Sequence, residues 1–365
     1  MKPHRVTALL GRRDEPTDAV EEYCRYLGKA LKEHGFELQL LRVDFVERGW
    51  SPALEELRRQ AAEWRGEWVF VQYTALAWSK RGFPLRFSRV LNVLRNAGAR
   101  VAVVFHDVSP YSGKRFIDAI RRRTQVHAMR NACLRADLSV LTIALERVSW
   151  IPPQTSNAVF IPVGANLPAR LDAPASPEVG EGKRLTITVF GVTGGEAGRQ
   201  ESGAITEAVK FAAKRGGKLR LLAFGRHADD AEVYLREGLR ETDVELQVSG
   251  VLRGEGVVKN LASSDVSLFV RGGISTRRGS AIASIACGLP VVAYRGPETA
   301  FPISEAGVVL VSPENRGELG EALARVLGDA EYRESLRERS HRAQEKYFSW
   351  KAIAAKYAEV LRREG

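Results

Sequence analysis

Cysteine, histidine and long apolar runs are all scarce in this sequence. The three cysteines, Cys24, Cys133 and Cys287, are odd in number, far apart and embedded in apolar segments, which argues against a disulfide framework and favours a reducing cytosol. The six histidines are scattered, and no CxxC or paired Cys/His spacing indicates a zinc site. No apolar run approaches the ~20 residues that a membrane-spanning helix needs. The apolar stretch at residues 6–10 is too short for a signal peptide and is predicted to form a first strand.

The length and charge of the chain narrow its class further. A chain of 365 residues is longer than one hydrophobic core usually supports, so two domains are expected. Apolar residues make up 44% and charged residues 27%, which is typical of a globular protein. The net charge of +11 predicts attraction to something anionic. Charge alone leaves a nucleotide sugar, an anionic membrane surface and nucleic acid open.

Short β-rich runs alternate with longer segments of helical periodicity along most of the chain. In the first half the predicted strands are 6–10, 37–43, 68–73, 100–105 and 138–142, and the predicted helices are 18–35, 52–63, 85–96 and 113–132. In the second half the predicted strands are 185–190, 218–224, 244–248, 266–270 and 290–293, and the predicted helices are 202–215, 229–240, 256–262 and 279–286. This alternation is typical of parallel sheets with helices on both faces, which bind ligands at the carboxyl ends of their strands.

A stretch rich in Pro, Gly and small residues, 152–180, separates the two halves and is predicted to be a linker. We therefore expect an α/β protein with two Rossmann-like, doubly wound parallel-sheet domains that face a cleft. The expected domains are 1–170 and 171–345. A closing helical segment, 329–363, carries an apolar face that needs a partner.

The turn at residues 275–280 carries the strongest chemical signal. Gly279 and Ser280 open a helix directly after a strand and a turn, and helix N-termini bind phosphates through free N–H groups and a partial positive charge. The cations on this turn are Arg271, Arg277 and Arg278. Arginine suits bidentate contact with phosphate. The alternative is a solvated basic loop that Ser280 caps.

Three other residues are candidates on position alone. His106 follows strand 100–105 and precedes Asp107, at the edge where such sheets bind ligands. Its imidazole can donate to a sugar hydroxyl or shuttle a proton near neutral pH; the alternative is a histidine satisfied by the local backbone. Arg226 comes just after another strand end, and Glu298 either binds a donor or caps the helix that follows.

Residues 114–130 form a basic, partly amphipathic predicted helix. It is expected either to lie on an anionic membrane and bring the cleft to a lipid-linked acceptor, or to present a solvated face.

The second half resembles the family-4 glycosyltransferases of the GT-B fold. The resemblance is carried by ASSDVSL at 262–268, ACGLPVVA at 286–293, GPET at 296–299 and FSW at 348–350. It covers most of the chain and is more specific after residue 185 than before it. It implies transfer of a sugar from a nucleotide-diphosphate donor to a carbohydrate or lipid-linked acceptor, with retention of configuration, no cofactor and no metal.

The resemblance also implies that the last segment, 346–365, packs on the first domain, and it assigns roles to residues. The histidine that matches His106 faces the transferred sugar, and the loop after residue 190, with Gly191 and Arg199, clamps the diphosphate. Residues 11–16, at the position of a Gly-rich loop, are expected to shape the acceptor side. One departure is plain: Ser275 and Ala283 stand where the family has two glutamates that hold the sugar hydroxyls and the ribose. Donor recognition here must therefore differ or come from elsewhere.

These observations lead to one main hypothesis and several alternatives. The expected protein is a cytoplasmic glycosyltransferase, at the inner face of a membrane if residues 114–130 bind one, with no nucleic-acid partner. Its predicted catalytic residue is His106, and its predicted donor-binding residues are Gly191, Arg199, Arg226, Ser275, Arg277, Arg278, Gly279, Ser280 and Glu298. The alternatives are an inactive relative that binds a nucleotide sugar or glycan, a basic nucleic-acid-binding protein, and another sugar-nucleotide enzyme such as an epimerase.

Overall fold

A computed structural model describes residues 3–15, 17–152, 155–168 and 184–363 of the chain. The chain divides into two compact units, the first comprising 1–162 with 350–365 and the second comprising 163–349. The boundaries expected from the sequence were 170 and 345. Residues just after 162 group with the second unit because the N–H of Val163 donates to the carbonyl of Thr276 at 3.1 Å. Residues 153–154 and 169–180 of the predicted linker lie outside the described residues.

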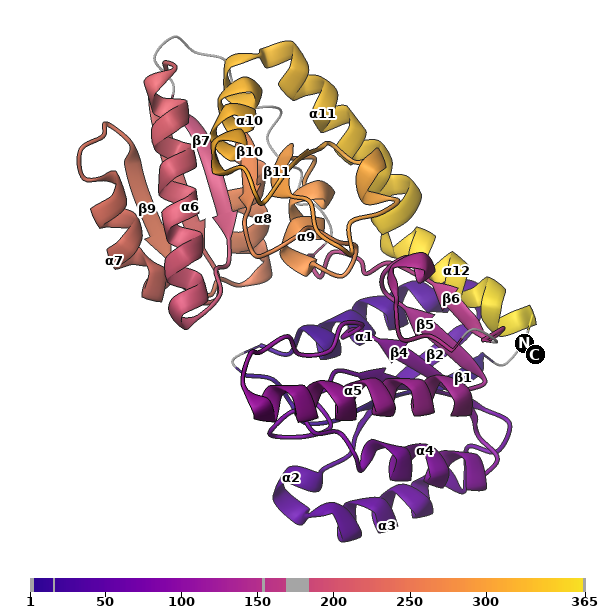
Figure 1. Ribbon diagram of the computed structural model, residues 1–365. Helices are drawn as coiled ribbons and strands as arrows, with labels where there is room; N and C mark the ends of the chain where they lie inside the picture. The colour runs from indigo at the N-terminus through magenta and orange to yellow at the C-terminus, as the bar shows by residue number, and fades with distance from the viewer. Residues whose placement is uncertain (1–2, 16, 153–154, 169–183, 364–365) are drawn as a thin grey trace. The chain divides into compact units, whose positions relative to one another are not determined.

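The first unit is a six-stranded parallel sheet in the order β2-β1-β3-β4-β5-β6 (Figure 1). Its strands are β1 (His4–Leu10), β2 (Phe36–Arg42), β3 (Trp68–Tyr73), β4 (Arg100–Phe105), β5 (Leu138–Leu141) and β6 (Ala158–Phe160). Its helices are α1 (Ala19–Leu31), α2 (Phe45–Arg48), α3 (Trp50–Ala61), α4 (Phe87–Asn96), α5 (Phe116–Arg135) and α12 (Trp350–Arg363). Successive strands are added on one side of β1 to give β2 and on its other side to give β3 and the strands that follow. The strand order therefore reverses between β1 and β3, and a crevice is expected at their carboxyl ends.

Helices cover both faces of this first sheet. Side chains of α3, α4 and α5 pack with one face into a common apolar core. On the other face, α12 packs on α1, where the hydroxyl groups of Tyr23 and Tyr357 are hydrogen-bonded at 2.9 Å. Trp350 at the start of α12 stacks on Tyr26 of α1, with ring centroids 5.7 Å apart. The last helix is thus part of the first unit, although the rest of the second half of the chain is not.

The second unit repeats this architecture with the strand order β12-β11-β10-β7-β8-β9 (Figure 1). Its strands are β7 (Leu185–Phe190), β8 (Leu219–Phe224), β9 (Glu245–Ser249), β10 (Val266–Phe269), β11 (Val291–Tyr294) and β12 (Val308–Val311). Its helices are α6 (Gly195–Lys214), α7 (Ala228–Leu239), α8 (Gly254–Ala262), α9 (Gly279–Ala286), α10 (Arg316–Gly328) and α11 (Ala330–Ala343). Here the order reverses between β7 and β10, which again predicts a ligand crevice at their carboxyl ends.

The expected elements differ from the structure in several places, and α2, β12 and α10 were not predicted. Strand β6 forms inside the predicted linker, because it pairs with β5 and needs only three residues. Helix α6 begins at Gly195 rather than at residue 202, since the glycines in its first turns hide the helical pattern. The closing helix is interrupted, because Ser349 has an extended backbone (φ −68°, ψ 145°) between a π turn at Gln344–Phe348 and α12.

Candidate functional site

The carboxyl-terminal edge of the second sheet brings together loops that follow β7, β8 and β10. Gly191, directly after β7, has a φ of 78°, which glycine adopts without strain. Its N–H donates to the carbonyl of Phe224 at the end of β8 (2.7 Å), and the N–H of Val192 donates to the carbonyl of Arg226 (3.1 Å). Arg271, just after β10, places its Nη1 atom 3.3 Å from the position that a Cβ on Gly191 would occupy. The strand-end loops therefore meet at Gly191.

Three arginines, Arg226, Arg271 and Arg278, form what we call the arginine cluster. Burial lowers the pKa of the Arg271 guanidinium; the carboxylate of Glu201 opposes this shift, and the positive charge of Arg226 adds to it. An Nη atom of Arg278 lies 3.9 Å from the position of a Cβ on Gly272, next to Arg271 in the chain. The cluster concentrates positive charge at the β7/β10 reversal, where an anion would relieve the mutual repulsion.

Within the predicted turn at 275–280, Arg277 serves a different purpose from its neighbours. Its Nε and Nη2 atoms donate to the two carboxylate oxygens of Glu298, both at 2.8 Å, and both side chains are mostly buried. The hydroxyl of Ser275 donates to the same carboxylate at 3.1 Å. This bidentate ion pair ties the turn to the loop after β11 and uses the hydrogen-bonding edge that Arg277 would offer a phosphate.

Glu298 places a carboxylate beside Ser275, one of the two positions where the resembling family has glutamate. The other position, Ala283, is buried in the apolar core between α8, α9 and the sheet. Glu298 does not cap a helix there, since the next helical turn begins at Ile303. From the sequence, Glu298 is expected to bind the donor or to cap a helix; in the structure it contacts Arg277 and Ser275, which lie 21 and 23 residues away in the chain.

The N-terminus of α9 follows the turn without a side-chain cap. Arg278 is its N-cap residue, and no side chain within the described second unit accepts from the first N–H groups of the helix. Ser280 does not act as the cap; its backbone carbonyl accepts a hydrogen bond from the hydroxyl of Ser284 at 3.2 Å. The N–H groups of Gly279 and Ser280 are therefore suited to an anionic ligand.

Arg199 lies apart from the arginine cluster. It was expected in a loop, but α6 already includes it, and its guanidinium stands over the ring of Tyr234 on α7, 5.8 Å from the centroid. The loop after β7 is held instead by Glu201, whose carboxylate accepts from the N–H and the hydroxyl of Thr193 at 2.7 and 2.6 Å. The structure thus brings Gly191 and Arg226 together and pairs Ser275 and Arg277 with Glu298, whereas Arg199 lies apart.

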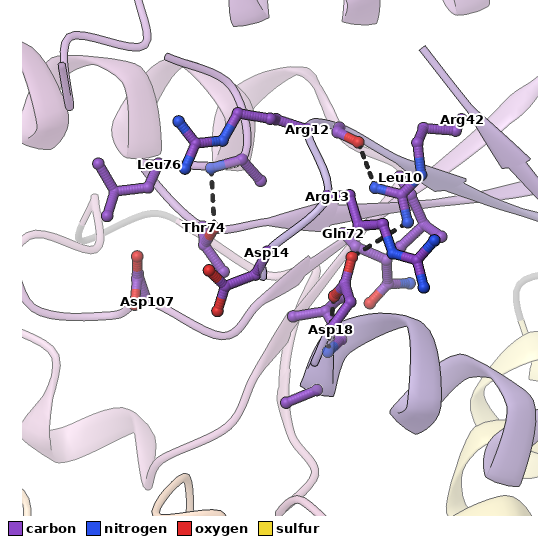
Figure 2. Close-up of a pocket in the computed structure, with 14 residues that line it drawn as sticks. Leu10, Arg12, Arg13, Asp14, Asp18, Arg42, Gln72, Thr74, Leu76 and Asp107 are labelled. Carbon is purple, nitrogen blue, oxygen red and sulfur yellow. Dashed lines mark hydrogen bonds and ion pairs between the residues drawn. The ribbon is translucent and has the colours of Figure 1, made fainter. Parts of the chain in front are cut away.

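A pocket of about 230 Å³ lies in the first unit at the carboxyl ends of β1 and β3, where the strand order reverses (Figure 2). Its lining combines three carboxylates, three guanidinium groups and neutral side chains: Leu10, Gly11, Arg12, Arg13, Asp14, Asp18, Ala19, Val20, Arg42, Gln72, Thr74, Leu76, Ala77 and Asp107. We call it the first-unit pocket. It includes most of the loop that was expected to shape the acceptor side; residue 16 of that loop lies outside the described residues.

The walls of the first-unit pocket are held by an internal ion pair. Arg42 donates to Asp18 at 3.0 Å and to the carbonyl of Gly11 at 2.6 Å (Figure 2). Asp18 also accepts from the N–H groups of Val20 and Glu21, so the same carboxylate caps α1. On the opposite side, Asp107 accepts from the N–H of Ala75 at 3.0 Å. The sequence does not single out Arg42, because Arg42 ends β2 whereas its partners, Gly11 and Asp18, follow β1.

His106 lies directly behind this pocket. Its Nε2 atom is 2.8 Å from Oε1 of Gln72, a pocket residue, and its ring meets the edge of the Tyr23 ring with centroids 4.9 Å apart. Burial lowers the pKa of His106 to about 4, against the opposing charge of Asp18. The imidazole is therefore neutral at pH 7. In that form it can orient or hydrogen-bond a hydroxyl, but its pKa does not suit a proton shuttle near neutral pH.

The described residues offer neither a metal cluster nor a membrane-spanning helix. They contain no group of three or more His, Cys, Asp or Glu side chains arranged to hold a metal ion. None of the helices among them has both the length and the hydrophobicity that crossing a bilayer demands.

Two Rossmann-like domains in one chain, each a parallel six-stranded sheet with helices on both faces, are the architecture of the GT-B fold. The predicted fold class is confirmed. No protein-family model matches the sequence, and no curated protein matches it.

Solved structures match along the whole chain. HepE from Anabaena, determined in complex with UDP and glucose, has a TM-score of 0.67 at 14% identity, covering 99% of this chain and 100% of its own. A glycosyltransferase from Rickettsia africae ESF-5 has a TM-score of 0.69 at 13% identity, covering 100% and 99%. A UDP-N-acetylglucosamine 2-epimerase from Listeria monocytogenes, so described provisionally, has a TM-score of 0.61 at 11% identity, covering 99% and 96%. At these identities the likeness establishes the fold.

Proposed function

We propose that this protein transfers a glycosyl group from a nucleoside-diphosphate sugar to an acceptor hydroxyl. The observation that carries the proposal is the arginine cluster beside the uncapped N-terminus of α9, at the strand reversal of the second unit. A nucleoside diphosphate gains negative charge as it leaves the sugar, and fixed guanidinium and N–H groups stabilise that charge in advance. Crystal structures of HepE with UDP and with UDP-glucose support a uridine donor.

The same groups account for a reaction that needs no divalent metal and no cofactor. Arginine side chains and a helix N-terminus can supply the positive charge that a metal ion provides in other phosphate-transfer sites. We propose retention of configuration on the basis of the family resemblance alone.

The first-unit pocket is the proposed acceptor site. Carboxylates accept hydrogen bonds from sugar hydroxyls, and Asp14 and Asp107 line the pocket. The neighbouring arginines, Arg12 and Arg13, suit an acceptor that also carries a phosphate or a carboxylate. His106 is proposed to act from behind this site, through Gln72, as a neutral hydrogen-bonding group.

A membrane-bound acceptor is supported by the first turns of α5. Phe116 is 83% exposed, and Ile117 and Ile120 on the same helix are also exposed. Exposed cations, among them Lys114 and Arg122, flank these apolar side chains. An apolar surface bordered by cations is typical of a segment that docks on an anionic bilayer, so we propose contact with the membrane here.

One specific observation favours a second candidate function. No carboxylate stands at Ser275 or Ala283, where the resembling enzymes hold the sugar and the ribose, and an inactive binding protein would tolerate that loss. The two functions differ in turnover. Formation of free UDP or of a glycosylated product from any of a panel of nucleotide sugars supports the transferase, and binding without turnover supports the alternative.

The donor site is tested by calorimetry with UDP, GDP and ADP in the presence of EDTA. We expect one of them to bind, and Arg278→Gln to raise its Kd by roughly tenfold or more, since a hydrogen bond to a charged group is lost. Arg240→Gln, on an exposed arginine at the end of α7, is the matched control and should leave Kd unchanged. Equal affinity of the wild type and Arg278→Gln would remove the turn from the site.

A further inference from the structure

The side chain of Arg271 stands at the point of the second sheet where a ligand is expected on topological grounds. It follows β10, which is hydrogen-bonded to β7, and the sheet order reverses between these two strands. Its guanidinium extends across the end of β7 to within 3.3 Å of the Cβ position of Gly191. Any other residue at position 191 would be strained at a φ of 78° and would press against this guanidinium.

Arg271 lacks the partners that a largely buried arginine ordinarily has. Within the residues that the structure describes, it makes no hydrogen bond or ion pair, and its Nε atom is buried without an acceptor. The nearest opposing charge is Glu201, but both oxygens of that carboxylate accept from Thr193. Burying a cation that has no ion pair among the described residues beside a second cation, Arg226, costs stability. The carboxylate of Glu201 offsets this cost only in part, since the pKa of Arg271 remains lowered.

Two nearby arginines, Arg277 and Arg199, make contacts that Arg271 lacks. Arg277 donates two hydrogen bonds to Glu298, and the guanidinium of Arg199 stacks over the ring of Tyr234. Among the described residues, Arg271 has neither an ion pair nor an aromatic ring contact, and its Nε atom is buried without an acceptor.

We propose that Arg271 is the residue that anchors the diphosphate of the donor, with Gly191 leaving the space that its guanidinium needs. The proposal deepens the proposed function and rests on it. An unpaired guanidinium offers two parallel N–H donors to one phosphate group, and the contact strengthens as the diphosphate takes up the charge of the broken glycosidic bond. The residue is kept at a cost to the stability of the free protein, because its partner arrives with the substrate.

Calorimetry and thermal unfolding of the full chain test this assignment. Arg271→Gln removes the positive charge, and Arg271→Lys keeps the charge but lacks the two parallel N–H donors of a guanidinium. Arg240→Gln is the matched surface control. The probes are UDP, GDP and ADP, each compared with its nucleoside in the presence of EDTA. We expect Arg271→Gln to raise the Kd of the diphosphate roughly tenfold to hundredfold and to leave the Kd of the nucleoside unchanged. Arg271→Lys should fall between wild type and Arg271→Gln.

The melting temperature of the ligand-free protein gives an independent readout. Because Arg271 is an unpaired, desolvated cation, Arg271→Gln should keep or raise that temperature while losing the stabilisation that the diphosphate confers. An unchanged diphosphate Kd, an equal loss for diphosphate and nucleoside, or a lowered melting temperature without ligand would each overturn the assignment. Failure of the wild type to bind any of the three diphosphates would instead overturn the proposed function itself.

Discussion

His106 shows how burial changes what a residue can do. From its position at a strand end, the sequence predicts either a proton shuttle or a hydrogen-bonding group. The structure surrounds it with Tyr23 and Gln72 and lowers its pKa to about 4, so the neutral form prevails well below pH 7. At the residue scale, a site can thus be located from sequence while its protonation state depends on neighbours that come from other elements.

The depressed pKa of His106 predicts how the stability of the first unit depends on pH. The unfolded chain, with an ordinary histidine pKa of 6.5, binds more protons than the folded chain between about pH 6.5 and pH 4. The contribution of His106 is therefore fully present above pH 6.5 and is lost as the pH falls through this window. We expect a loss of about 1–3 kcal/mol of unfolding free energy.

Urea unfolding followed by tryptophan fluorescence measures this loss, because all six tryptophans belong to the first unit. A His106→Asn variant should lose less stability than wild type between about pH 7.5 and pH 4.5. His127→Gln, at an exposed position on α5, should behave as wild type. An identical pH dependence in wild type and His106→Asn would contradict the prediction.

The arginines of the second unit separate into two groups that the sequence does not distinguish. Arg271, Arg277 and Arg278 lie within eight residues of one another and read as one basic run. Only the fold brings Glu298 to Arg277, 21 residues away, and leaves Arg271 at Gly191. Residues distant in sequence therefore decide whether an arginine stabilises the fold through an ion pair or is available to a ligand.

At the scale of elements, α5 packs one face of its second half on the core and exposes apolar side chains at its start. The predicted apolar residues of this helix do not share a face: Met129 is 1% exposed and belongs to the core, whereas Phe116 at the first turn is 83% exposed. Arg121 is held by Asp118 and stacks on the rings of Phe83 and Tyr111. The proposed membrane contact is therefore confined to the start of the helix.

Cosedimentation with lipid vesicles tests this contact. We expect wild type to bind vesicles that contain phosphatidylglycerol and not vesicles of phosphatidylcholine alone, because both charge and apolar area contribute. The double variant Phe116→Ser, Ile117→Ser should lose most of this binding. Leu134→Ser, at a 70% exposed apolar position near the other end of α5, serves as the control and should still bind. Wild type that stays in the supernatant with both kinds of vesicle would exclude the proposed contact.

The boundaries of elements followed from sequence wherever hydrophobic pattern and termination signals agreed. The expected strands 68–73, 100–105 and 185–190 coincide with β3, β4 and β7, which are buried runs bounded by polar or glycine residues. The start of α6 was not predicted because Gly195, Gly198 and Gly203 interrupt the helical pattern there. Glycine lowers helix propensity wherever tertiary contacts do not compensate. There Gly198 packs against the carbonyl of Thr193, a contact that a side chain would prevent.

At the scale of the whole molecule, the first unit is completed by the end of the chain. Helix α12 buries Ile353, Ala354, Tyr357, Ala358 and Leu361. Its larger apolar side chains contribute about 5 kcal/mol or more at the usual value per buried residue, which is a large part of the stability of a typical domain. Lys356 of α12 lies over the ring of Phe160 in β6, so the last strand of the unit also ends beside this helix.

This dependence predicts that a fragment of residues 1–162 does not fold cooperatively on its own. A fragment in which a flexible Gly/Ser linker joins residue 162 to residues 350–363 should recover a sigmoidal unfolding transition, measured by tryptophan fluorescence in urea. The same fusion with Tyr357→Asp, which places a charge at a fully buried position, is the matched negative control. Cooperative unfolding of fragment 1–162 at the same urea concentration as the fusion would show that α12 is dispensable.

By itself, the sequence determined the fold class, the order of most strands and helices, and the two strand-end regions that hold the candidate sites. These properties follow from periodicity, glycine positions and the location of polar residues after apolar runs, all of which are local. Only the tertiary structure decided that Arg271 is unpaired, that Arg277 belongs to Glu298, that His106 is neutral and that α12 belongs to the first unit. Those properties depend on burial and on contacts between residues far apart in the chain, which a local pattern does not encode.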